Sequence, residues 1–184
     1  MAYTRPPAPA ELERVETFCN SARFLYGEDA FTDLRSARAW LREHGWADAA
    51  ETADEGALGR LRRLRAALRD HLEDPTAPAA REVLTDLAHR VLGPPRWDDP
   101  GERPRLRPRE QGAVEALASE LLAVLATAEL SGGRERLKVC RFQQCRWVYY
   151  DRSPGNNSAW CSMDICGARN KMRSYRARRE GNGS

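Results

Sequence analysis

The sequence contains no long apolar run. No apolar stretch approaches the roughly 20 residues that a membrane-spanning helix needs, and the N-terminal residues MAYTRPPAPAELERVE lack the apolar core of a secretory signal. Hydrophobic residues make up 41% and charged residues 31% of the 184 positions, which excludes wholesale disorder. We therefore expect a domain of ordinary size with a small appendage, located in the cytoplasm and without a membrane partner.

Cysteine is scarce outside one segment. Only Cys19 of the five cysteines lies outside residues 136–179, and the other four form two pairs with the spacing C-x4-C: Cys140 and Cys145, then Cys161 and Cys166. In a reducing cytoplasm, clustered cysteines are more often metal ligands than disulfides. Cys19 is far from the others in sequence, and we expect it to be a small buried thiol of the core.

The two matched cysteine pairs indicate zinc. Thiolates suit Zn2+, which takes four ligands tetrahedrally in a closed structural site. A segment of about 45 residues cannot bury enough apolar surface to fold unaided, so the metal would supply much of its folding energy. The sequence therefore predicts a Zn2+ site made by Cys140, Cys145, Cys161 and Cys166, with two disulfides or free thiols as the alternatives.

Charge is divided unevenly along the chain. Residues 134–180 hold twelve Lys or Arg and four Asp or Glu, so this segment carries +8. Since the whole chain carries +3, the rest carries −5. A mildly acidic body joined to a basic module is typical of proteins that contact polyanions.

Apolar residues at helical spacing predict a mainly α-helical N-terminal domain over residues 1–133. We expect helices over residues 10–22, 33–44, 54–73, 78–92 and 109–130, the last of them central, and a short strand near residues 105–107. The helix over residues 54–73 carries five arginines away from its leucines. We expect them to form a solvated face paired with acids, with an anion-binding surface as the alternative.

Residues 134–184 predict a small zinc-ribbon-like β-hairpin followed by a basic C-terminal helix. Aromatic and β-branched residues over 146–150 favour a strand, and residues 153–157 have the composition of a turn. Trp147, Tyr149 and Trp160 are expected to cover the metal as a miniature core, with base stacking as the alternative.

The helix expected over residues 167–179 is strongly cationic. Ala168, Met172 and Tyr175 lie at helical spacing, and we expect this apolar stripe to dock on the zinc site. Basic residues surround this stripe, and no acidic residue lies among them. We therefore expect these residues to contact phosphate groups. The candidate nucleic-acid-binding residues are Arg169, Lys171, Arg173, Arg176, Arg178 and Arg179. A solvated C-terminal tail is the alternative.

These residues resemble the CGNR zinc finger family. The shared features are the cysteine pairs, the Asp-Arg-Ser at residues 151–153, the Trp-Cys at residues 160–161 and the basic helix. The tetrad that names the family is here Cys-Gly-Ala-Arg over residues 166–169, so Ala168 replaces the usual Asn and the hydrogen bond of that Asn is not carried over.

The N-terminal part resembles the helical ABATE domain that accompanies this finger. The resemblance is carried by Phe-Cys-Asn-Ser over residues 18–21 and by Trp40-Leu41 followed by Gly45. Together, the two resemblances imply a bacterial stress-related transcription regulator.

Three classes of function compete at this point. The leading hypothesis is a zinc-containing, DNA-binding regulator whose N-terminal domain senses a small-molecule effector or forms a homodimer. The second is an adaptor that binds an acidic protein of the transcription machinery.

An enzyme is the least favoured class. Four cysteine ligands leave no open zinc position for water, and the deaminase, phosphate-loop and nucleophile-elbow motifs are absent from the sequence. A small-molecule pocket lined by Asn20, Arg23 and Trp40 is a further hypothesis for the N-terminal domain.

Overall fold

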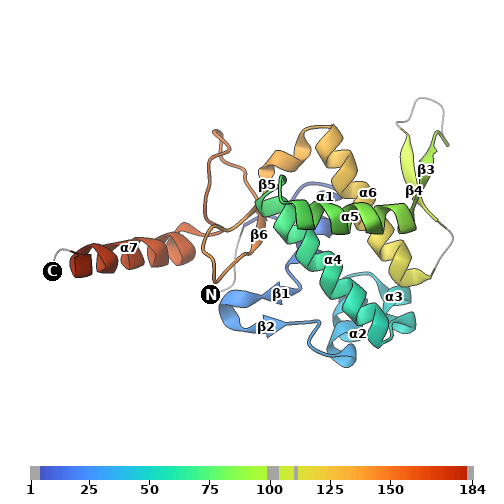
Figure 1. Ribbon diagram of the computed structural model, residues 1–184, viewed down its shortest axis with the longest axis horizontal. Helices are drawn as coiled ribbons and strands as arrows, with labels where there is room; N and C mark the ends of the chain where they lie inside the picture. The colour runs from blue at the N-terminus through green and yellow to red at the C-terminus, as the bar shows by residue number, and fades with distance from the viewer. Residues whose placement is uncertain (1–4, 99–103, 110–111, 182–184) are drawn as a thin grey trace.

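The computed structural model describes residues 5–98, 104–109 and 112–181. Figure 1 shows a body of packed helices from which one helix projects at the C-terminal end. The α-helices are α1 (Leu12–Cys19), α2 (Leu34–Glu43), α3 (Ala47–Thr52), α4 (Glu55–Glu73), α5 (Pro78–Val91), α6 (Ala113–Leu130) and α7 (Ala168–Gly181). The antiparallel strand pairs are β1 (Ala22–Arg23) with β2 (Glu28–Asp29), β3 (Leu92–Arg96) with β4 (Arg105–Pro108), and β5 (Leu137–Val139) with β6 (Val148–Tyr150).

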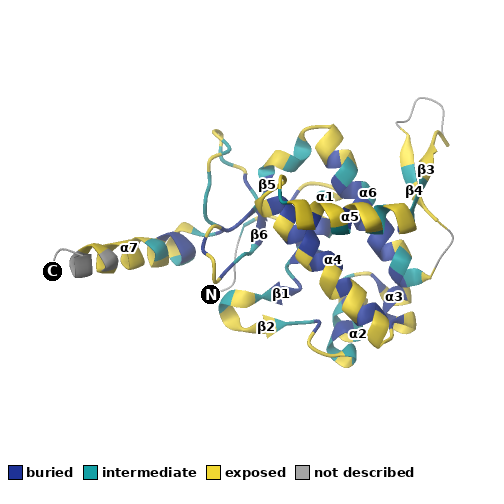
Figure 2. Cartoon of the chain, viewed as in Figure 1, coloured by how far each residue is buried: buried dark blue, intermediate teal, exposed yellow. Residues whose placement is uncertain are grey.

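Helix α6 lies at the centre of the body, as the sequence predicts. It contacts α1, α3, α4 and α5, and it is buried on a broad face by residues such as Leu117, Leu121 and Leu125. A helix that is apolar around most of its circumference is stable only when other elements cover it on several sides. Figure 2 shows that the buried residues are concentrated where α4, α5 and α6 meet.

Local signals set the ends of the other helices. Asp33 and Asp54 cap α2 and α4, since their carboxylates accept hydrogen bonds from the backbone N–H groups of Ser36 at 2.8 Å and Ala57 at 2.6 Å. Gly45, at a φ of +82°, supplies the left-handed residue that follows α2. The predicted strand near residues 105–107 is confirmed as β4.

Several boundaries differ from the sequence prediction. Helix α1 ends at Cys19 instead of continuing to residue 22, because Ala22 pairs with Asp29 in a short hairpin. Helix α6 begins at Ala113, because the backbone N–H of Arg109 still bonds to the carbonyl of Val91 beside the β3–β4 hairpin. The short helix α3 and the β1–β2 hairpin were not predicted, since six- and two-residue elements carry too little periodicity.

The arginines of α4 do not form one solvated face. Arg65 is buried and holds Asp29 through two hydrogen bonds of 2.7 Å. Arg69 is 1% exposed, donates to the carbonyl of Ala22 at 2.6 Å and lies over the ring of Phe24. Burial lowers the pKa of Arg69 to about 10. The prediction was wrong for these two residues, because their guanidinium groups anchor the β1–β2 hairpin.

The cysteine-bearing hairpin packs directly on the helical body. Leu137, Val139 and Val148 of β5 and β6 are buried in the same apolar cluster as the leucines of α4 and α6. The side chain of Asn20, at the end of α1, donates to the carbonyl of Val148 at 2.7 Å and accepts from its N–H at 2.9 Å. Arg146 adds ion pairs with Asp70 and Glu73 of α4. The two parts of the chain therefore share a core.

Removal of the Asn20 side chain should weaken this connection. We expect Asn20→Ala to lower the free energy of unfolding by about 2 kcal/mol, because both backbone groups of the fully buried Val148 lose their partner. Urea denaturation of the zinc-loaded protein measures the change. The matched control is Asn157→Ala, in an exposed turn, which should stay within about 0.5 kcal/mol of the parent. Equal losses for the two variants would contradict the proposed clamp.

Candidate metal centre and basic helix

Tight backbone turns bring each cysteine pair together. After β5, the N–H of Cys140 bonds to the carbonyl of Trp147 at 2.9 Å, and the N–H of Cys145 bonds to the carbonyl of Phe142 at 2.7 Å. Arg146 then takes a left-handed φ of +47°, which turns the chain into β6. The second pair lies at a single π-helical turn, Met163–Gly167, in which the N–H of Cys166 bonds to the carbonyl of Ser162.

The four thiol sulfurs form a compact buried cluster. All four Sγ atoms lie within 4.8 Å of one another, and none of the four cysteines is more than 5% exposed. The Cys161 Sγ lies 3.6 Å from the Sγ atoms of both Cys145 and Cys166. A tetrahedral ion with Zn–S bonds of about 2.3 Å places its sulfurs roughly 3.8 Å apart. The donor set and its spacing therefore fit zinc.

The thiols cannot all ionise without a cation between them. Hydrogen bonds from the Cys145 and Cys161 thiols lower the pKa of Cys140, whereas hydrogen bonds with the Cys140 and Cys145 sulfurs raise the pKa of Cys161 by favouring its protonated form. Burial raises the pKa of Cys166 to about 12. Zinc supplies the charge that lets all four act as thiolates, and four protein ligands close the site to substrate water.

Aromatic and apolar side chains insulate the cysteine cluster. Phe142 and Tyr149 are buried against the cysteines, and Trp147, Trp160 and Ile165 pack around them while remaining partly exposed. The Tyr149 hydroxyl donates to the carbonyl of Ser158 at 2.7 Å, and burial raises its pKa. This arrangement matches the predicted miniature core and leaves Tyr149 no face for base stacking.

A buried carboxylate organises the loop between the two cysteine pairs. Asp151 is fully buried and accepts hydrogen bonds from the Lys138 ammonium at 2.7 Å and from the N–H groups of Ser153 and Ser158 at 2.9 Å. Burial alone would raise the pKa of Asp151, but these donors outweigh it and hold the pKa well below its usual range. The Asp-Arg-Ser motif at residues 151–153 is visible in the sequence, but the role of Asp151 in this loop depends on the fold.

Helix α7 begins at the metal centre and projects into solvent. Gly167 stands between Cys166 and the helix, and a Cβ there would lie 3.1 Å from the Met163 Sδ and 3.4 Å from the Trp160 Cδ1. The predicted docking of an apolar stripe on the zinc site was wrong. Ala168, Met172 and Tyr175 are all exposed, the last two by about half. The reason is that α7 points away from the body, so its sides do not pack against it (Figure 1).

The cations of α7 lie on two faces. Arg169, Arg173 and Arg176 line an open groove with Phe142 and Gln144 of the finger. Lys171 and Arg178 are exposed elsewhere on the helix. None of these five cations forms an ion pair with the residues that the structure describes. Arg173 donates to the side-chain oxygen of Asn170 at 3.2 Å and lies 5.6 Å from the centroid of the Phe142 ring. Arg179 lies within α7, but its side chain is outside the described residues.

The residues of the hypothetical N-terminal pocket make separate contacts. Asn20 is committed to Val148, and Arg23 pairs with Glu28 at 2.7 Å and covers the ring of Tyr26. Trp40 stacks on His44 and on Trp46, whose rings lie 4.1 and 5.6 Å from its own. These contacts do not support a common pocket. Asn20 is instead a structural link to the finger, which one sequence without a fold could not reveal.

The fold and site define a class: a four-cysteine zinc finger built onto a helical body. A model of the CGNR zinc finger matches residues 136–179. The ABATE model, described as "Putative stress-induced transcription regulator", matches residues 5–131. This match covers more than half of the chain, which therefore belongs to the ABATE family and carries a CGNR zinc finger. No curated relative matches the chain.

Loss of one ligand should release the metal. We expect Cys145→Ala to reduce bound zinc from one ion per chain to much less than one, because three thiolates leave the ion open to water and chelators. Metal analysis after dialysis against a chelator measures the loss. Cys19→Ala is the matched control, since Cys19 is equally buried but lies in the helical core. Equal zinc content in the two variants would contradict the assigned ligands.

The Asp151 network should be strongly coupled. We expect Asp151→Asn to destabilise the zinc-loaded protein by about 3 kcal/mol, because the Lys138 ammonium loses a buried carboxylate. In a double-mutant cycle with Lys138→Met, the combined loss should be smaller than the sum of the two single losses. Urea denaturation at neutral pH measures all three variants, and strict additivity would argue against the pair.

Proposed function

We propose that the protein is a DNA-binding regulator in which the zinc finger presents α7 to the phosphate backbone. The observation that carries this proposal is a projecting helix on a metal-anchored base, with five cations that form no ion pair with the described residues. Like charges crowded along one helix repel each other, and phosphate groups relieve this repulsion. An α-helix with exposed side chains also has the width that a major groove admits.

The cations of α7 form two sets, for which we expect different contacts with DNA. Arg169, Arg173 and Arg176 share the groove beside Phe142, so we assign them to one strand of phosphates or to guanine edges. Lys171 and Arg178 would contact phosphates on the other side of the helix, and Arg179 belongs to the same proposed DNA-binding set. The acidic remainder of the chain would be held away from DNA, since α7 projects from the body (Figure 1).

Phosphate binding predicts a steep and measurable salt dependence. Each lost phosphate contact reduces the slope of log K against log salt by about 0.9. We expect Arg173→Ala with Arg176→Ala to weaken DNA binding and to flatten the slope by about 2. Fluorescence anisotropy with a labelled duplex at several salt concentrations measures both quantities.

The control for this experiment removes the same charge from the other end of the molecule. Arg35→Ala with Arg42→Ala alters two exposed arginines of α2 and should leave the slope unchanged. Figure 1 places α2 on the side of the body opposite α7. Binding of the parent protein that does not respond to salt would refute phosphate contact.

Docking on an acidic protein is the second candidate, because Met172 and Tyr175 are half exposed among the cations. An acidic surface with apolar residues would bury both, as a partner in the transcription machinery could. Retention of a protein partner after nuclease treatment, together with no binding to duplex DNA, would favour this adaptor. A membrane partner is not proposed: among the described residues, no helix has both the length and the apolar character of a membrane span.

The helical body is proposed to sense a small-molecule effector or to form a homodimer, in the cytoplasm of a bacterium. All the residues that we assign to DNA contact lie in the C-terminal part of the chain. The helical body is therefore available for a second role, which supports this part of the proposal. Light scattering of the purified protein with and without DNA tests the homodimer.

A further inference from the structure

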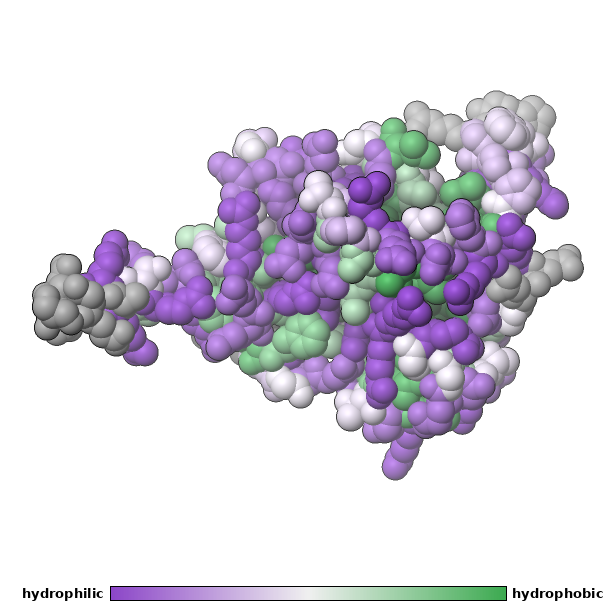
Figure 3. Space-filling view, viewed as in Figure 1, coloured by the Kyte–Doolittle hydropathy of each residue, from purple (hydrophilic) through white to green (hydrophobic). Residues whose placement is uncertain are grey.

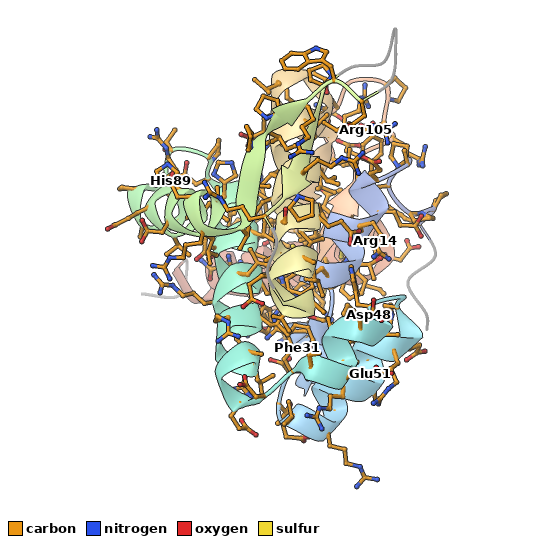
Figure 4. The ribbon with its side chains drawn as sticks, turned by 90° about the vertical axis from the view of Figure 1, so that its right-hand side faces the viewer. Arg14, Phe31, Asp48, Glu51, His89 and Arg105 are labelled. Atoms are coloured by element: carbon orange, nitrogen blue, oxygen red, sulfur yellow. The ribbon has the colours of Figure 1, made fainter. Side chains whose placement is uncertain are left out.

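An open cleft lies between β4 and α6, on the side of the body remote from the zinc finger. Its volume is about 500 Å³, which is in the range of small-molecule sites. Figure 4 views this side of the molecule, with Arg105 of β4 and Arg14 of α1 labelled beside α6. Figure 3 shows apolar residues at the surface next to the base of the β3–β4 hairpin.

Apolar residues form part of both long walls of the cleft, beside the charged side chains of Arg105, Arg107 and Glu120. Leu106 and Pro108 of β4 form one wall, and Ala116, Ala123 and Val124 of α6 form the other. Successive side chains of a strand point to opposite sides, and the half-buried Leu106 lies between two exposed arginines. Leu106 is therefore the residue of β4 that faces α6. Because Pro108, Ala116 and Ala123 are small or cyclic, a flat ring would fit between the apolar parts of the two walls.

One polar group of the cleft floor has no partner. Ser119 is 1% exposed, and its hydroxyl makes no hydrogen bond with the described residues. A buried hydroxyl without a partner costs free energy, and such groups are uncommon in native structures. Because the hydroxyl can both donate and accept, it supplies an anchor for a polar atom of a bound molecule.

The charges around the cleft leave one carboxylate uncompensated. Glu120 is held by Arg14 and by the Trp46 indole N–H, and Arg107 is held by Asp98. The Glu11 carboxylate, by contrast, forms no ion pair with the described side chains although it lines the cleft. Arg105 also lines the cleft and is not without a partner. Among the charged residues of the cleft that the structure describes, the uncompensated charge is therefore the negative one of Glu11.

We propose that this cleft binds a small aromatic amine. Its ring would lie between the β4 and α6 walls, a polar ring atom would bond to the Ser119 hydroxyl, and its ammonium group would face Glu11. This assignment deepens the effector-sensing part of the proposed function. It does not depend on DNA binding, and it is tested without DNA.

Three probes with one ring and different charges test the assignment. Tryptamine, indole and indole-3-acetate are titrated into the zinc-loaded full-length protein, and amide shifts are followed by heteronuclear NMR. We expect shifts centred on Leu106, Ser119 and Val124, with tryptamine binding about fivefold more tightly than indole-3-acetate. No shifts at these amides with any probe, or equal affinities for the two charged probes, would overturn the proposal.

Matched variants assign the binding to the cleft. Ala123→Phe fills the slot and should weaken tryptamine binding more than about tenfold, whereas Ala126→Phe, which points into a different groove between α5 and α6, should leave it unchanged. Equal affinities for these two variants would place the site elsewhere and overturn the proposal.

Two polar variants keep the test decisive if Ala123→Phe does not fold. Ser119→Ala should weaken binding about fivefold through the lost hydrogen bond. Glu11→Gln should remove the preference for tryptamine, whereas Glu13→Gln, an exposed change two residues away, should not. A charge preference that survives Glu11→Gln overturns the role of that carboxylate and with it the class of ligand. DNA binding measured separately distinguishes this failure from failure of the proposed function.

Discussion

Four buried sulfurs around one cation are the constraint on which the C-terminal part of the chain depends. All four sulfurs lie within 4.8 Å of one another, which suits a single zinc ion, and they cannot all be ionised without one. The same ligands set the direction of α7, because Cys166 lies in the π-helical turn from which that helix continues. Metal binding is thus a folding step that also sets the direction of the basic helix.

The zinc finger is not a separate domain joined to the helical body by a linker. Its hairpin has two buried faces: Cys140 and Tyr149 face the metal cluster, while Leu137, Val139 and Val148 belong to the core of the helical body. Asn20 replaces a strand neighbour for Val148, and Arg146 binds two carboxylates of α4. The predicted division at residue 133 follows the change in composition, and the two sides of it are joined by this shared core.

Hydrophobic periodicity predicted the long helices, and the spacing of the cysteines predicted the metal ligands. Helices α4 and α6 carry enough leucines for their pattern to be plain, and the four cysteines are chemically conspicuous. The predictions failed where tertiary contacts determine whether a side chain is buried or exposed. Arg65 and Arg69 look like surface charges until Asp29 and the Ala22 carbonyl are placed beside them. Met172 and Tyr175 have the spacing of a docking stripe, but both side chains are about half exposed because α7 projects from the body.

The shared core also limits how an effector could act on DNA binding. Helix α6 forms one wall of the cleft, and its Glu120 holds Arg14 of α1, the helix whose end carries the Asn20 clamp. The far end of α6 carries Glu129, which pairs with His71 and Arg134 just before β5. A ligand can shift an equilibrium only through different affinities for two states. Because β6 packs on α1, and the 3-10 turn Gly133–Arg136 that leads into β5 packs on α6, we expect those states to differ in the packing of α1 and α6. A free hinge between two domains is then not required.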